Sequence, residues 1–185
     1  MIPVALIALR IMLGPVVFVL AEHKAAGIWV AICLILAFLS DVFDGVIARR
    51  LHIAAEKLRV ADSRADAWYL LWLIFAIQQT ALPLIRPYLF WISLEIVLQV
   101  FSYLFDLCKY GRIASLHAYS AKLWGLFLFA AVFGILVLHT GFPWIPMAVG
   151  AGIISFLDAL AIKIFLKTWQ HDVPSCIHAY RMSRM

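Results

Sequence analysis

Two pairs of aspartates lie close together in the chain, and they are the residues best suited to chemistry. The first pair is Asp41 and Asp44, and the second pair is Asp62 and Asp66. At about 100° per residue, the members of each pair would lie on one face of a helix. Carboxylates gathered in this way repel one another unless a cation lies between them. Their hard oxygen atoms suit Mg²⁺ or Mn²⁺, and four carboxylates are about the number that two such ions share.

The composition around these acids is that of a membrane protein. Of the 185 residues, 66% are hydrophobic and 14% are charged, and the mean hydropathy is +1.02. An ordinary soluble domain is roughly 45–50% apolar, and a globule of this length cannot bury so much more. The composition excludes a soluble globular enzyme, a disordered chain and a disulfide scaffold. It indicates a protein embedded in the lipid bilayer, for which we expect no nucleic-acid partner.

Six apolar runs are long enough to cross a bilayer, which takes about 20 residues. The runs cover residues 2–20, 27–48, 66–86, 88–106, 122–139 and 144–167. Each run should be a helix, because a backbone exposed to lipid must satisfy its own hydrogen bonds. We therefore predict an all-α bundle of six transmembrane helices that forms a single domain over residues 1–185.

The distribution of basic residues predicts the orientation of this bundle. Twelve lysines and arginines follow the second and fourth runs or lie in the C-terminal region, whereas the opposite side has two, Lys24 and Arg86. Basic loops stay in the cytosol, so both termini are predicted to be cytosolic. Asp41 precedes Arg49 by eight residues, which is about 12 Å along a helix. The aspartates are thus expected near the cytosolic interface, where a metal ion can meet both a soluble phosphate and a lipid.

The spacing of these residues resembles the signature of the CDP-alcohol phosphotransferase family. The signature reads Asp-x2-Asp-Gly-x2-Ala-Arg-x8-Gly-x3-Asp-x3-Asp, and most of its fixed positions match this chain. The matching residues are Asp41, Asp44, Gly45, Ala48, Arg49, Asp62 and Asp66. Leu58 stands where the signature has its second glycine, and its side chain fills space that a glycine would leave to a nucleotide.

The resemblance implies an enzyme of phospholipid biosynthesis. Such an enzyme transfers the phosphatidyl group of CDP-diacylglycerol to a small polar alcohol and releases CMP. The resemblance makes Asp41, Asp44 and Asp62 metal ligands for Mg²⁺ or Mn²⁺. It gives Asp66 a share in ligation and the further role of general base toward the alcohol. It also implies a homodimer.

The resemblance assigns the nucleotide to the small and basic residues of the motif. Gly45 and Ala48 would leave room for the cytidine, and Arg49 would hold a phosphate. Arg10 lies inside the first apolar run. It is similar to a basic residue often found in the first span of such enzymes, and an equal alternative is that it pairs with an acid.

The alcohol acceptor is less clearly indicated by the sequence. Lys109, Arg112 and Lys122 follow the fourth run, where they would either hold the phosphate of a phosphorylated alcohol or act only as topology signals. Length and layout resemble the phosphatidylglycerophosphate synthases, which makes glycerol 3-phosphate the first expectation. An inositol-type alcohol or another polar head group is the alternative.

Three other interpretations compete with this one. An intramembrane prenyltransferase also combines Asp-rich motifs with Mg²⁺, but its motifs lie far apart in the chain. A cation-coupled transporter would need ionisable residues near the middle of the bilayer and interrupted helices. A catalytically impaired member of the same family is the third alternative, because Leu58 replaces the glycine of the signature.

Overall fold

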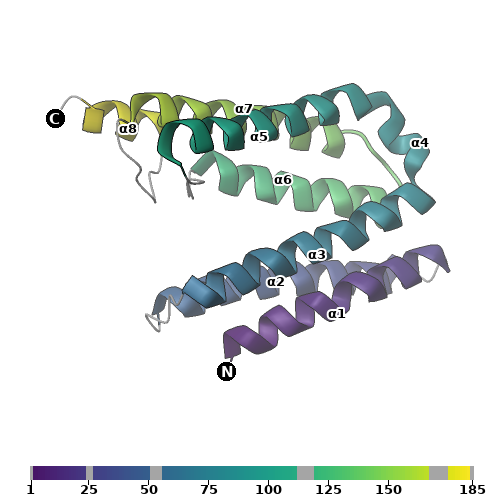
Figure 1. Ribbon diagram of the computed structural model, residues 1–185. Helices are drawn as coiled ribbons and strands as arrows, with labels where there is room; N and C mark the ends of the chain where they lie inside the picture. Colours follow the sequence, from purple (N-terminus) through teal and green to yellow (C-terminus); the bar gives the residue numbers. More distant parts are fainter. Residues whose placement is uncertain (1, 24–26, 51–55, 112–118, 167–174, 184–185) are drawn as a thin grey trace. The chain divides into compact units, whose positions relative to one another are not determined.

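Every secondary-structure element in the residues that the structure, a computed structural model, describes is a helix (Figure 1). These residues are 2–23, 27–50, 56–111, 119–166 and 175–183. The elements are α1 (Ile2–Glu22), α2 (Gly27–Arg50), α3 (Glu56–Thr80), α4 (Leu82–Ile85), the 3₁₀ helix η1 (Arg86–Tyr88), α5 (Leu89–Tyr110), α6 (Tyr119–Leu136), α7 (Trp144–Phe165) and α8 (Cys176–Ser183). The predicted all-α class is confirmed.

Four helical stretches within the described residues are long and apolar enough to cross a membrane. They are Val4–Glu22, Leu82–Tyr110, Tyr119–Leu136 and Trp144–Phe165. Helix α2 is apolar over the shorter segment Gly27–Phe43, and α3 begins with a charged segment. These helices indicate a membrane-embedded protein, while the six-span count and the cytosolic termini stay predictions.

The third and fourth predicted spans are divided at a different place from the one expected. The ranges 66–86 and 88–106 put the break beside Pro87, whereas α3 ends at Thr80 and α4 begins at Leu82. Pro83 explains the earlier break, because proline lacks an N–H and its ring would clash with a carbonyl of the preceding turn. The helix therefore stops before the first proline of this segment and not at the second.

The chain divides into two compact units, and the first comprises Met1–Leu84 and Val132–Thr140. Its helix α1 packs against both α2 and α3. Most of the small or apolar side chains that these helices bury are three or four residues apart, the spacing that keeps side chains on one helix face. The buried side chains include Ile7, Leu13 and Val17 of α1, Val30, Leu34 and Ala37 of α2, and Leu73, Ala76 and Ile77 of α3.

Helices α1 and α3 are in close contact beside Gly14. A Cβ atom at Gly14 would lie only 2.9 Å from Cδ1 of Trp72, so a side chain at this position would need the helices to move apart. One turn away, Nε1 of Trp68 donates a hydrogen bond to the carbonyl oxygen of Ile11 at 3.2 Å. Small residues let helices approach closely in membranes. These contacts fix the register of α1 against α3 near Arg10.

The second unit comprises Ile85–Ala131 and Gly141–Met185, and polar contacts join its helices α5 and α7. The Lys163 ammonium of α7 is buried and donates to Oδ2 of Asp106 at 2.8 Å and to Oγ of Ser102 at 2.6 Å. Two side chains of α5, the ammonium of Lys109 and the hydroxyl of Tyr110, also donate to the backbone carbonyl oxygen of Lys163, at 2.6 and 2.8 Å. The last two bonds satisfy a carbonyl at the helix end, which has no partner within α7.

The Asp158 carboxylate of α7 forms hydrogen bonds to α6 and to α8. Oδ2 of Asp158 accepts a hydrogen bond from the hydroxyl of Ser120 at 2.7 Å, and Oδ1 accepts one from the backbone N–H of Cys176 at 3.2 Å. Ser120 belongs to α6, and Cys176 is the first residue of α8. Ala179 of α8 is fully buried against Ile162 and Leu166. The short helix α8 is thus fastened to the end of α7.

Candidate metal centre

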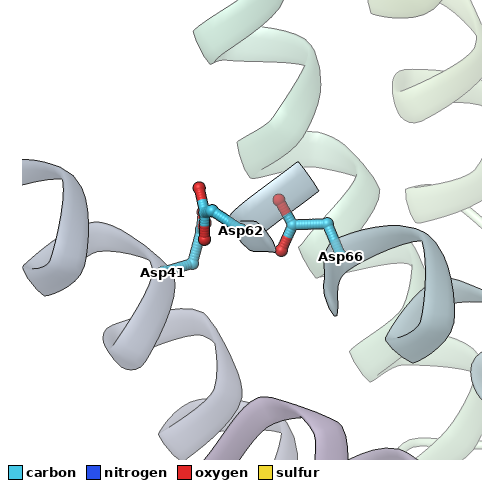
Figure 2. A group of neighbouring side chains, drawn as sticks. All are labelled: Asp41, Asp62 and Asp66. Atoms are coloured by element: carbon cyan, nitrogen blue, oxygen red, sulfur yellow. The ribbon is translucent and has the colours of Figure 1, made fainter. Parts of the chain in front are cut away.

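Three of the four aspartates that the sequence singles out lie together in the first unit. Figure 2 shows Asp41 on α2 and Asp62 and Asp66 on α3, with the three carboxylates gathered. One carboxylate oxygen of each lies within 4.8 Å of the others. Such a group of hard oxygen atoms fits a divalent cation, which would be held by these carboxylates together with water or a substrate phosphate.

Local structure explains why these side chains meet. Asp62 and Asp66 are four residues apart on α3 and therefore share one helix face. Asp41 follows the buried Ser40, whose hydroxyl donates to the carbonyl oxygen of Ala37 at 2.7 Å. Asp41 thus lies where the buried face of α2 gives way to exposed residues.

The carboxylates are accessible from outside the unit. The side chains of Asp41, Asp62 and Asp66 are 52%, 34% and 48% exposed. A buried acidic cluster would have to be neutral or fully paired, because burying a charge is costly. These acids can instead remain ionised and meet a ligand that arrives from outside the unit.

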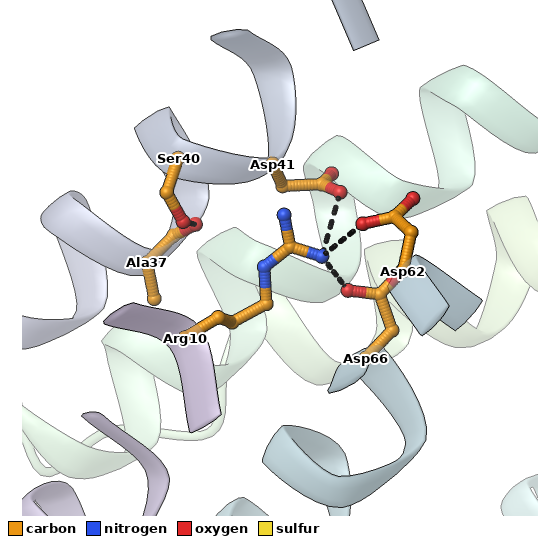
Figure 3. A network of polar contacts seen from close by, with 6 residues as sticks. All are labelled: Arg10, Ala37, Ser40, Asp41, Asp62 and Asp66. Atoms are coloured by element: carbon orange, nitrogen blue, oxygen red, sulfur yellow. Dashed lines mark hydrogen bonds and ion pairs between the residues drawn. The ribbon is translucent and has the colours of Figure 1, made fainter. Parts of the chain in front are cut away.

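A buried arginine lies among the three carboxylates (Figure 3). Arg10 of α1 is 1% exposed. Its Nη1 lies 3.3 Å from Oδ1 of Asp41 and 3.1 Å from Oδ1 of Asp62, and it also donates to Oδ1 of Asp66. Of the two interpretations of Arg10, the structure favours a partner for acids. One guanidinium opposite three carboxylates still leaves this group of side chains with a surplus of negative charge.

The central position of Arg10 is the main feature of the site that sequence reasoning did not identify. The contacts of Arg10 with Asp62 and Asp66 join residues more than 50 positions apart, so no local pattern could show them. A usable signal was present, because an arginine inside an apolar helix is costly unless it has a partner. The four aspartates of the motif were the obvious candidates for that partner.

The remaining motif residues of α2 follow Asp41 along the same helix. Asp44, Gly45, Ala48 and Arg49 belong to α2, but their side chains lie outside the described part of the structure, and so does the side chain of Leu58. Metal ligation by Asp44 and nucleotide binding by the other three motif residues therefore stay predictions.

The residues predicted to bind the acceptor have contacts of their own in the second unit. Lys109 donates to the carbonyl oxygens of Lys163 and Ile164 at 2.6 and 3.2 Å. The ammonium of Lys122 lies 5.5 Å from the ring centroid of Tyr119. Arg112 lies outside the described residues. Acceptor binding by Lys109, Arg112 and Lys122 stays a prediction.

Comparison with known proteins identifies the family. The family model of the CDP-alcohol phosphatidyltransferases matches residues 1–164, a range that includes Arg10 and the three clustered aspartates. No curated protein and no solved structure matches the chain. Members of this family transfer substituted phosphate groups and generally depend on divalent metal ions. Because the match extends over most of its length, the chain belongs to the CDP-alcohol phosphatidyltransferase family.

Proposed function

We propose that this protein transfers the phosphatidyl group of CDP-diacylglycerol to a small polar alcohol and releases CMP. Family membership supports transfer from a CDP-alcohol to an acceptor in phospholipid biosynthesis. One observation carries the assignment of the site, namely the gathering of the Asp41, Asp62 and Asp66 carboxylates. Glycerol 3-phosphate is the first candidate acceptor, on the resemblance in length and layout. An inositol-type alcohol is the alternative.

The clustered carboxylates are proposed to hold Mg²⁺ or Mn²⁺, with two ions as the expected number. Asp41, Asp62 and Asp66 would be ligands, and Asp44 would complete the set. When bound, the metal supplies positive charge that binds the diphosphate and stabilises CMP as the leaving group. The negative surplus of the cluster and its accessibility support this assignment.

Asp66 is proposed to act as the general base. Its carboxylate takes the proton of the alcohol, whose oxygen attacks the phosphorus that carries the lipid. The bond between this phosphorus and the oxygen of CMP breaks, and CMP leaves with the electron pair of that bond. No covalent enzyme intermediate is needed, so most of the catalysis comes from positioning and electrostatics. The 48% exposure of the Asp66 side chain is consistent with access for an alcohol.

Substrate binding is proposed to involve the rest of the motif. Gly45 and Ala48 leave room for the cytidine, and Arg49 holds a phosphate of the diphosphate. The site is proposed to lie near the cytosolic side of the membrane, in a bundle of six spans that forms a homodimer. This position would let the lipid tails of the substrate stay in the bilayer.

The basic residues of the second unit are proposed to bind the phosphate of the acceptor. Lys109, Arg112 and Lys122 carry the positive charges required for this role, and the chain brings them within fourteen positions of one another. A phosphorylated alcohol such as glycerol 3-phosphate would use them, and an uncharged alcohol would not.

An alcohol-panel assay tests the proposed function. The purified protein in lipid vesicles is supplied with CDP-diacylglycerol, Mg²⁺ or Mn²⁺ and one alcohol at a time, and the lipid product is identified by mass. We expect CMP release that depends on the metal ion and is fastest with glycerol 3-phosphate. Faster reaction with an inositol-type alcohol would replace the proposed acceptor. Folded protein that releases no CMP with any alcohol and either metal would contradict the proposed function.

A further inference from the structure

Arg10 lies at the centre of the acidic cluster and not at its edge. A single atom, Nη1, contacts Oδ1 of Asp41, Asp62 and Asp66 together (Figure 3). These carboxylates are the ones whose oxygen atoms could surround a metal ion. The guanidinium is therefore positively charged, like the cation that the site is proposed to bind, and it lies close to the position proposed for that cation.

Packing around Arg10 holds its side chain in this place. Its neighbours on the same face of α1, Ile7, Leu13 and Gly14, are buried, and Gly14 is pressed against Trp72 of α3. The close contact at Gly14 keeps the backbone of α1 beside α3 one turn from Arg10. A divalent cation must therefore bind with this positive charge close by.

We propose that Arg10 is a built-in counter-cation that sets the metal affinity of the site. Without a divalent ion, Arg10 offsets the repulsion among the three carboxylates and keeps them gathered. When a divalent ion binds, the like charge of the guanidinium opposes it. Arg10 is thus a positioning residue that acts through the carboxylates. This inference rests on the proposed function, because it assumes that the cluster holds a divalent cation.

Mn²⁺ titration of the purified protein without substrate tests the proposal. The electron paramagnetic resonance signal of free Mn²⁺ reports the bound fraction directly, so enzyme activity is not needed. We expect Arg10→Met to bind Mn²⁺ at least about tenfold more tightly than the unmodified protein, because a repulsive charge a few ångströms away is removed. Equal or weaker binding by Arg10→Met would overturn the proposal, and weaker binding would show that Arg10 only holds the carboxylates in position.

The matched control removes a buried cation elsewhere in the chain. Lys163→Met takes away the ammonium that pairs with Asp106 in the other unit of the chain. The Mn²⁺ affinity of the folded variant should stay within about twofold of the unmodified value, since its ion pair is with Asp106 and not with the three clustered aspartates. An equal gain in affinity for Lys163→Met would contradict a specific role of Arg10. If the unmodified protein binds no Mn²⁺, the proposed metal site itself fails. If it binds Mn²⁺ but Arg10→Met does not bind more tightly, only this inference fails.

A measurement on the unmodified protein covers the case in which Arg10→Met does not fold. The chain is labelled with ¹⁵N-arginine, and the Nε–H resonance of Arg10 is identified by its loss in Arg10→Lys. Titration with diamagnetic Mg²⁺ should shift this resonance, because the carboxylates that contact the guanidinium become metal ligands. A resonance that does not respond to saturating Mg²⁺ would overturn the proposal.

Discussion

Among the described residues, each unit has a buried basic side chain paired with carboxylate oxygen, but the two clusters differ in charge balance and in exposure. Arg10 is 1% exposed and faces three carboxylates, whose side chains are 34–52% exposed. Lys163 is 4% exposed, and its salt bridge joins it to Asp106, which is fully buried. The first group, Arg10 with Asp41, Asp62 and Asp66, is accessible and carries surplus negative charge, and we call it the open cluster. The second group, Lys163 with Asp106, is buried and pairs one charge with one opposite charge, and we call it the closed cluster.

This difference separates a structural ion pair from a site that can take a ligand. A buried pair with matched charges connects two helices, and removing one partner is strongly destabilising. A cluster with unmatched charge is unfavourable by itself and gains most when a further cation binds. Charge imbalance among accessible groups therefore marks the functional cluster better than burial does.

The largest effect is expected from Asp66→Asn in the open cluster. This change keeps the size of the side chain but removes the proton acceptor, so CMP release should fall by about 10²–10⁴-fold, the range typical of a lost general base. The rate is measured on folded protein with CDP-diacylglycerol and the preferred alcohol.

Asp106→Asn is the matched control for this change. It removes a carboxylate from the closed cluster, and the folded fraction should keep a rate within a few-fold of the unmodified protein. An Asp66→Asn protein with nearly full activity would contradict the general-base assignment.

The closed cluster should matter most for stability. Lys163→Met leaves the Asp106 carboxylate buried without its ammonium partner, and the free energy of unfolding should fall by about 3–5 kcal/mol. Unfolding in detergent by heat or denaturant measures the change. The double variant Lys163→Met with Asp106→Leu should recover most of the loss. Equal loss in the single and double variants would show that the charge pairing is not the cause.

A smaller effect is expected at the helix contact that positions the open cluster. Gly14→Ala places a Cβ atom against Trp72, and overpacking of this kind costs about 1–3 kcal/mol. Gly125→Ala is the control, because nothing lies within 4 Å of a Cβ atom built at Gly125. The two variants are compared by thermal unfolding. Equal stability of both would contradict a tight approach of α1 and α3.

The smallest effect is expected where a tyrosine caps the end of α7. Tyr110→Phe removes the hydroxyl that donates to the carbonyl oxygens of Lys163 and Leu166, which should cost about 1 kcal/mol. Tyr119→Phe changes a tyrosine that is 65% exposed and should leave the unfolding temperature unchanged. A loss of similar size in both variants would argue against a specific role for the Tyr110 hydroxyl.

The sequence predicts the all-α class and the common helix face of Asp62 and Asp66, because both depend on local spacing. Apolar runs of sufficient length have to be helices in lipid, and residues four apart on one helix meet whatever their surroundings, as Asp62 and Asp66 do. The predicted break beside Pro87 is misplaced because another proline, Pro83, comes before it and already prevents α3 from continuing past Thr80.

Contacts between distant segments could not be predicted in this way. Arg10 meets acids of two other helices, and only the packing of α1 against them decides which side chains it reaches. Lys163 is one of the twelve basic residues that predict the orientation, in the C-terminal region, yet it is buried and paired with Asp106. A lysine near the end of an apolar run has the same local pattern in both cases, so sequence spacing alone does not distinguish them.

Lys163 forms hydrogen bonds to α5 through both its side chain and its backbone. Its ammonium donates to Ser102 and Asp106, and its carbonyl oxygen accepts from Lys109 and Tyr110. Sliding α7 along α5 by one turn, or rotating it about its axis, would break both sets of bonds at once. Helices α5 and α7 should therefore move together as one rigid pair. Any rearrangement that admits a substrate or releases a product should then occur in segments other than the α5–α7 pair.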